Sequence, residues 1–144
     1  MAQDLLQLHE QALSFMTDVI HGVTDKAWNN QSPCDAWSVR DVVNHITSEN
    51  LWAEPLMDGK TVEEVGDCFD GDVLGSDPKA AWDQAAKEAS VAFGVPNAAR
   101  KTVHVSWGDI SGKQYLEQMT TDLIVHGWDT VSYTHLTLPT NREV

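Results

Sequence analysis

Apolar residues at helical spacing, repeated in four separate segments, constrain this chain most. In residues 3–25 the hydrophobic stripe recurs at steps of three and four positions, through Leu5, Leu8, Ala12, Met16, Val19 and Val23. Such a stripe predicts an amphipathic helix with one buried face. Comparable stripes occur in residues 38–56, in the alanine-rich segment 76–94 and in residues 113–129. Four helices in one domain of this size favour an all-α four-helix bundle.

The segments between the expected helices carry turn signals. Residues 57–76 are rich in glycine and acids, which predicts a long connection between the second and third helices, with a short helical turn at Val62–Val65. That length would let the third helix run parallel to the second. Residues 101–107 alternate like a strand and residues 108–112 read as a turn, so a short β-hairpin could precede the fourth helix. In that strand His104 is expected to face solvent.

The charge of the chain excludes several classes of partner. Its 22 acids and 9 bases give a formal net charge of −13, which would repel nucleic acids and anionic membrane surfaces. No apolar run approaches the roughly 20 residues of a membrane span, and the N-terminus does not read as a signal peptide. We therefore expect a cytoplasmic protein whose two cysteines, Cys34 and Cys68, stay reduced.

An acid and a histidine one helical turn apart mark the fourth expected helix. Asp122 and His126 lie at i and i+4, a spacing that places two side chains about 6 Å apart on one face. His45 lies at the edge of the apolar stripe of the second helix. If the three meet, two imidazoles and a carboxylate could hold one divalent metal and leave coordination positions open for water or substrate. Zn is the first candidate, and Ni, Fe or Mn would accept the same donors.

Other interpretations of these residues stay open. The acid–histidine pair also fits a surface ion pair, because this spacing is common on helices. His9 lies beside the buried stripe of the first helix. It is either a histidine at the edge of the core with a local hydrogen bond or a fourth metal ligand. Cys34 precedes a helix N-terminus, where the pKa of a thiol is lowered, so it is either a rival nucleophile or a loop residue packed against Trp37.

Three stretches carry a family resemblance: residues 32–41 (SPCDAWSVRD), residues 43–46 (VNHI) and residues 122–129 (DLIVHGWD). In order and separation they resemble the DinB-like superfamily, and more closely its actinobacterial branch related to the N-terminal domain of mycothiol-dependent maleylpyruvate isomerase. The resemblance implies a DinB-like four-helix bundle, metal ligands at His45, Asp122 and His126, and mycothiol as a co-substrate of some members. The isomerase pattern has Glu where this chain has Asp122, and the shorter acid must approach a metal from a different distance.

Three functions compete on this basis. The leading hypothesis is a metal-dependent thiol transferase or isomerase-like enzyme, in which the metal activates a small-molecule thiol toward an electrophilic substrate and the 57–76 connection closes over the site. The second is a non-catalytic, stress-related bundle that binds metal or thiol. The third is a structural bundle with incidental histidines. The catalytic residues and the substrate are not specified by the sequence, and a homodimer is compatible with a small bundle that has an open edge.

The last residues, 131–144, do not continue the helical pattern. Their sequence, VSYTHLTLPTNREV, resembles the translated read-through of a transposase-type sequencing adapter. We therefore expect residues 1–130 to form a C-terminally truncated DinB-like domain and residues 131–144 to be a non-native tail. His135 is left out of the candidate site for this reason.

Overall fold

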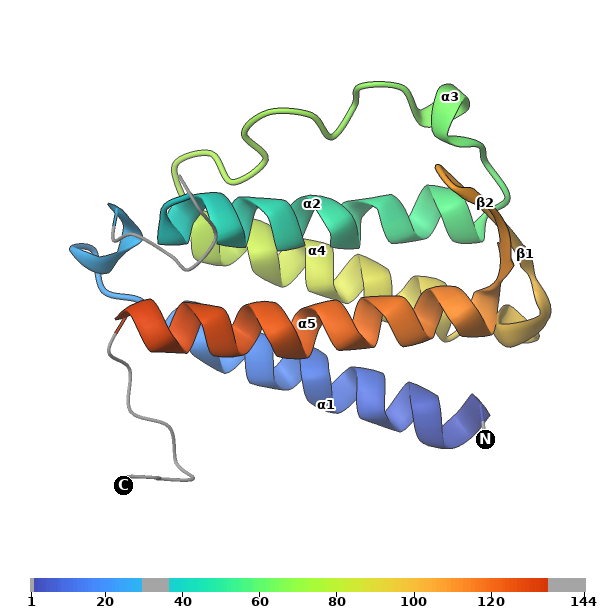
Figure 1. The fold of residues 1–144 in the computed structure, drawn as a ribbon, viewed down its shortest axis with the longest axis horizontal. Coiled ribbons are helices and arrows are strands. Elements are labelled where there is room, and N and C mark those ends of the chain that lie inside the picture. The colour runs from blue at the N-terminus through green and yellow to red at the C-terminus, as the bar shows by residue number, and fades with distance from the viewer. Residues whose placement is uncertain (1, 30–36, 135–144) are drawn as a thin grey trace.

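Four long helices lie side by side and form the body of the protein (Figure 1). The computed structural model describes residues 2–29 and 37–134. The long helices are α1 (Ala2–His21), α2 (Val39–Met57), α4 (Pro78–Phe93) and α5 (Gly112–Thr134). The short elements are the 3₁₀ turns Ala27–Asn29 and Ala98–Arg100, the helix α3 (Val62–Val65), and the strands β1 (Thr102–Val105) and β2 (Gly108–Ser111). The predicted all-α bundle with a short hairpin is confirmed.

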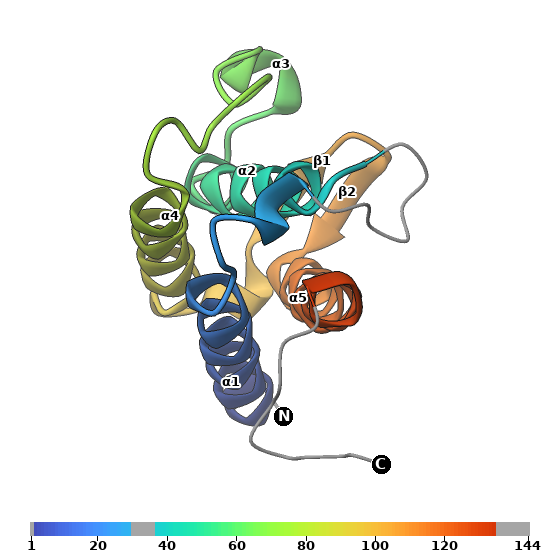
Figure 2. The ribbon, with the colours of Figure 1, turned by 90° about the vertical axis from the view of Figure 1, so that its left-hand side faces the viewer.

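The helices form a ring around a shared core. Viewed along the bundle, α2 lies between α4 and α5, and α1 closes the ring between the same two helices (Figure 2). Helices α1 and α5 run in one direction and α2 and α4 in the other (Figure 1). The third long helix therefore runs parallel to the second, as the length of the connection predicted. No helix within residues 2–29 and 37–134 is long and apolar enough to cross a membrane.

The helix starts follow capping signals in the sequence. The Ser38 hydroxyl accepts the Asp41 N–H at 3.1 Å, and the Asp41 carboxylate accepts the Ser38 N–H at 3.0 Å. This reciprocal capping box satisfies two donors at the start of α2. Asp77 caps α4 by a single bond, accepting the Ala80 N–H, and Pro78 occupies the first turn, where a missing N–H costs nothing. The predicted start sites are therefore confirmed.

The core consists of two clusters along the bundle axis. One cluster surrounds Trp82, Met16 and Leu123, all fully buried between α1, α4 and α5. The Trp82 indole N–H donates to the Thr17 hydroxyl at 2.9 Å, so this large ring is buried without an unpaired donor. The second cluster surrounds Phe93 and the inner faces of α2 and α5. Together they bury most of the apolar residues in the predicted stripes, but the prediction is wrong for Leu8, which is 45% exposed.

The connection between α2 and α4 runs back along the outer face of α2 (Figures 1 and 2). The Asn44 side chain fastens it twice, donating to the Gly71 carbonyl at 2.9 Å and accepting the Val73 N–H at 2.8 Å. The Arg40 guanidinium forms an ion pair with Asp72 at 3.1 Å. The predicted helical turn is α3, and its capping box is built on Thr61.

The hairpin differs from its prediction in where it turns. Strands β1 and β2 pair antiparallel, with Val105 opposite Gly108, so the chain reverses at residues 106–107 and residues 108–111 form the second strand rather than the turn. Gly108 has a φ of 132°, which L side chains rarely adopt. His104 is partly exposed and contacts Asp109 across the strands at 2.8 Å. Its side chain lies on the other face of β1 from the buried Val103, as the alternation predicted.

Two helix ends differ from the predicted ones. Helix α1 ends at His21, four residues before the predicted limit, because Gly22 is a poor helix former. Helix α5 continues through residues 131–134, so the expectation that the helical pattern stops at residue 130 is wrong for these four. Adding a turn to an existing helix costs little, and the Thr130 and Ser132 hydroxyls bond to carbonyls one turn earlier. Residues 135–144 lie outside the described part of the chain.

Candidate functional site

The two histidines of the predicted site lie next to each other across the α2–α5 interface. The ring centroids of His45 and His126 are 5.3 Å apart. The His45 ring also contacts Trp37, with centroids 5.3 Å apart. The structure therefore brings together residues that are 81 positions apart in the sequence (126 − 45).

The orientation of the His126 ring is set by its own helix. Its Nδ1 lies 2.8 Å from the backbone carbonyl of Asp122. Since a carbonyl oxygen can only accept, Nδ1 carries the proton in this contact and Nε2 keeps a lone pair. A hydrogen bond of this kind orients a metal-binding histidine and selects its tautomer.

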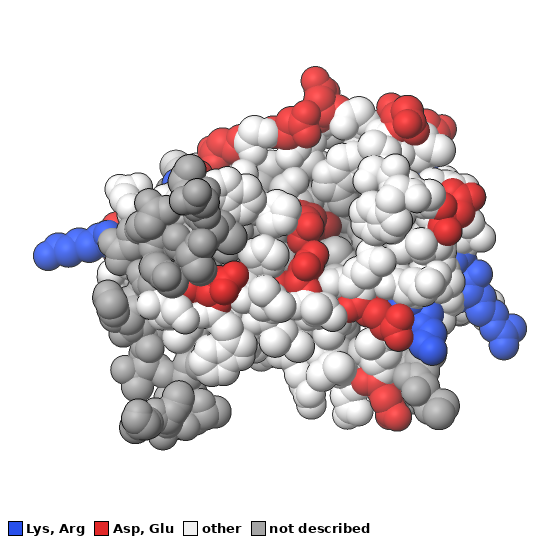
Figure 3. All heavy atoms as spheres, in the orientation of Figure 1, with Lys and Arg blue, Asp and Glu red and all other residues white. Residues whose placement is uncertain are grey.

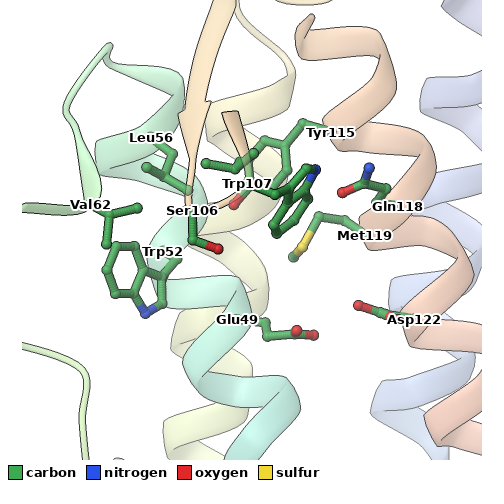
Figure 4. Close-up of a pocket in the computed structure, with 11 residues that line it drawn as sticks. Glu49, Trp52, Leu56, Val62, Ser106, Trp107, Tyr115, Gln118, Met119 and Asp122 are labelled. Carbon is green, nitrogen blue, oxygen red and sulfur yellow. The ribbon is translucent and has the colours of Figure 1, made fainter. Parts of the chain in front are cut away.

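Two carboxyl groups face each other one helical turn away from the histidines. Glu49 extends from α2 and Asp122 from α5, and their carboxyl groups point toward one another (Figure 4). The Glu49 Oε2 atom lies 3.3 Å from His45 Nε2. The Glu49 Oε1 atom is buried and has no hydrogen-bond partner among the described residues. An unpaired oxygen of a buried carboxylate is costly, so this position favours a cation or a shared proton.

The electrostatics of the four side chains reflect this crowding of acids. Burial raises the pKa of Asp122 to about 6, and the negative charge of Glu49 adds to the rise. The nearby histidines oppose this rise only in part. The hydrogen bond with Glu49 raises the pKa of His45, while burial lowers it. Together these side chains form a site with an excess of negative charge.

The donors are adjacent but do not converge on one point. Within residues 2–29 and 37–134, no three His, Cys, Asp or Glu side chains have donor atoms gathered around a single point as a bound metal requires. His45 is turned toward Glu49, and the Asp122 carboxyl faces Glu49. Metal binding by His45, Asp122 and His126 therefore stays a prediction.

The sequence reasoning missed Glu49 as a member of this site. The sequence did contain a spacing that pointed to it. His45 and Glu49 lie at i and i+4, as Asp122 and His126 do, but with the histidine first and the acid second. Helices α2 and α5 run in opposite directions, so the two spacings place histidine beside histidine and acid beside acid.

The remaining candidates lie elsewhere. His9 is fully buried and packs edge-on against Phe93, with centroids 5.1 Å apart. Neither of its ring nitrogens has a hydrogen-bond partner among the described residues, so the expected local hydrogen bond is not formed. Burial lowers the pKa of His9 to about 4. Cys68 is free and exposed, whereas Cys34 lies outside the described residues.

A cavity of about 250 Å³ adjoins the two carboxyl groups. Its apolar walls come from α2, the hairpin, the connection and α5: Trp52, Leu56, Val62, Val105, Trp107 and Met119. Its polar lining consists of Glu49, Ser106, Tyr115, Gln118 and Asp122. The acids therefore belong both to the candidate metal site and to one end of an apolar cavity (Figure 4). This combination is typical of small-molecule sites.

Comparisons with known proteins agree with this architecture. The chain is 24% identical over 135 residues to uncharacterized proteins from two strains of Mycobacterium tuberculosis, covering 91% of this chain and 68% of theirs. The crystal structure of a DinB-like protein from Bacillus subtilis superposes with a TM-score of 0.74 at 11% identity, covering 98% of this chain and 99% of that one. This likeness shows a DinB-like fold. The family model for the mycothiol maleylpyruvate isomerase N-terminal domain matches residues 9–130. The chain belongs to the mycothiol maleylpyruvate isomerase N-terminal domain family.

Proposed function

We propose that this protein binds one divalent metal at His45, Asp122 and His126, and uses it in a thiol-dependent transferase or isomerase-like reaction. The observation that carries the proposal is the meeting of two histidines and two acids at the α2–α5 interface, at one end of an apolar cavity. Zn is the first candidate for the metal, and mycothiol is the co-substrate that the family's description favours.

The side chains fit such an ion in three respects. The lone pair on His126 Nε2 is available because Nδ1 bonds to the Asp122 carbonyl. The buried Glu49 Oε1 atom has no hydrogen-bond partner among the described residues. Burial first, and then the charge of Glu49, raises the pKa of Asp122, so a cation beside the two carboxyl groups would relieve both costs. The longer Glu49 side chain is placed to supply a second carboxylate beside Asp122, whose shorter side chain departs from the family pattern.

The chemistry divides between the metal and the chain. When bound, a divalent metal supplies Lewis acidity that favours the thiolate form of a thiol near neutral pH. The Glu49 carboxylate is placed to accept the thiol proton as the sulfur adds to an electrophilic carbon–carbon double bond, and to return that proton to the neighbouring carbon as the π bond is lost. In a transferase that carbon–sulfur bond remains, and in an isomerase the thiol is expelled again. The apolar cavity excludes water and positions the electrophile.

Metal content tests the first half of the proposal. Protein purified from metal-replete medium is expected to carry about one equivalent of metal by elemental analysis, and the His45→Ala His126→Ala double variant is expected to carry almost none. The matched control is His21→Ala His104→Ala. Both of these histidines are half-exposed and paired with acids outside the site. Equal metal content in the two double variants would refute the site.

Turnover separates the enzyme from a binding protein. Consumption of an electrophile that requires both a low-molecular-weight thiol and the bound metal supports the enzyme. Stoichiometric metal without thiol-dependent turnover would leave a metal-binding bundle of the second, non-catalytic kind. Absence of metal, together with no thermal shift on adding Zn or Ni, would instead favour a structural bundle.

A further inference from the structure

The charge and shape of the cavity beside Glu49 and Asp122 restrict what can occupy it. We propose that this cavity binds the uncharged, apolar part of the substrate, a neutral aromatic or short alkyl group, and discriminates against carboxylates. This inference rests on the proposed function only where it identifies the bound group as part of the electrophilic substrate. The preference of the cavity for neutral groups is separately measurable.

The walls of the cavity are suited to a flat, apolar group. Two indole rings, Trp52 and Trp107, line it together with the thioether of Met119 (Figure 4). Aromatic rings and methionine offer polarisable contact area to an aromatic or alkyl ligand. The volume of about 250 Å³ lies below the roughly 300–1,000 Å³ that drug-sized ligands fill. A group of about one ring therefore fits the space better than an extended molecule does.

The charges around the cavity are all of one sign. The acidic residues that line the cavity are Glu49 and Asp122, and its lining contains no Lys or Arg. On the face of the molecule drawn in Figure 3, acidic side chains gather between α2 and α5, and the described Lys and Arg lie toward the two ends. Burying a carboxylate here would bring it beside like charge without a Lys or Arg in the lining to pair with it. A divalent ion would cancel the two acids and still leave no net positive charge.

The rim of the cavity provides a contact that a ligand would bury. Trp107 lies in the hairpin turn and is 66% exposed although it lines the cavity. A large exposed aromatic ring at the mouth of a pocket is typical of ligand contact. Trp52 is partly buried and packs edge-on against Phe69 of the connection, with centroids 5.8 Å apart. The two indole N–H groups therefore serve as local reporters of occupancy.

The test compares two probes that share the same ring and methyl group, one with a neutral amide and one with a charged carboxylate. Binding of 4-methylbenzamide and of 4-methylbenzoate is followed through the assigned indole N–H resonances at about pH 7.5, in EDTA-treated and in Zn-loaded protein. We expect the amide to shift the Trp52 and Trp107 signals and to bind at least about tenfold more tightly than the carboxylate in the EDTA-treated protein. In the Zn-loaded protein the ratio should be smaller, because the ion offsets the charge of both acids. The Glu49→Gln Asp122→Asn variant should reduce this ratio to below about threefold in EDTA.

A pair of tryptophan variants locates the binding. Trp107→Ala is expected to weaken amide binding by about tenfold. Trp128→Ala removes another exposed tryptophan that does not line the cavity, and should leave amide binding unchanged. Equal or tighter binding of the carboxylate in EDTA-treated protein, no shift with either probe, or equal effects of the two tryptophan variants would overturn the inference. Zn uptake without probe binding would overturn this inference alone. Probe binding without metal uptake would overturn the proposed function and leave the preference for neutral groups standing.

Discussion

The buried histidine His9 should make the stability of this protein depend on pH in a defined window. Its ring is completely buried, and neither nitrogen is paired among the described residues. Burial lowers its pKa from 6.5 to about 4, because the charged form would lose its hydration without gaining a partner. In the unfolded chain the same ring is hydrated and keeps its ordinary pKa.

The sign and size of the effect follow from this difference in pKa. Above about pH 7 both states hold a neutral ring, so His9 contributes no pH dependence. As the pH falls from about 6.5 to about 4, the His9 ring binds a proton in the unfolded state but stays neutral in the folded state. The free energy of unfolding therefore decreases. At about 1.4 kcal/mol per pKa unit, the loss approaches about 3 kcal/mol near pH 4. That is a large part of the roughly 5–15 kcal/mol by which domains are stable.

Substitution of His9 by leucine isolates this contribution. The variant removes the titrating group and keeps an apolar side chain of similar volume, so at about pH 7.5 its stability should match or exceed that of wild type. At about pH 4.5 it should exceed wild type by a further 2 kcal/mol or so, measured by urea unfolding in EDTA. Val43→Ala, which truncates another fully buried side chain, is the control and should lower stability equally at both pH values. The reasoning is refuted if the difference between His9→Leu and wild type is the same at both.

Four further substitutions test the site and the packing around it. Asp122 has a folded-state pKa of about 6, above its ordinary 3.8, so its favourable contribution is complete below about pH 4 and is lost as the pH rises through 6. In urea unfolding at about pH 7.5, Asp122→Asn should therefore stabilise the EDTA-treated protein by about 1 kcal/mol, after allowance for solvent screening. The same substitution should abolish the additional stability that Zn gives to the wild type. Gly112→Ala would place a methyl group 1.9 Å from the Ala98 carbonyl oxygen and should cost at least about 2 kcal/mol in thermal unfolding. Gly127→Ala would place a methyl group 2.5 Å from the half-buried Phe15 ring. It should cost less than Gly112→Ala, because a side chain shifts more easily than backbone and helix propensity offsets part of the contact. Asn44→Ala removes both bonds to the connection and should speed proteolysis within residues 58–77 while global stability falls by only about 1 kcal/mol.

The parts of the fold that depend on local chemistry could be predicted from the sequence. The cap at Ser38 and the helical turn at Val62–Val65 each follow from a few neighbouring residues. The turn of the hairpin was placed wrongly, because Gly108 suits a strand end with positive φ as well as a turn. His9 could not be assigned, because its surroundings come from Phe93, far along the chain. Its burial depends on the packing of α1 against α4 rather than on its own helix.

The candidate site shows the same division between local spacing and tertiary register. The pairs His45–Glu49 and Asp122–His126 are each visible as i, i+4 spacings, but which residue faces which depends on the antiparallel packing of α2 against α5. A register suited to stability alone would set each acid against a histidine of the other helix. Here the histidines adjoin each other and the acids face each other, so the bundle keeps like groups together at the expense of stability. Such local conflicts are expected where function requires them, and a cation bound between the helices would remove this one.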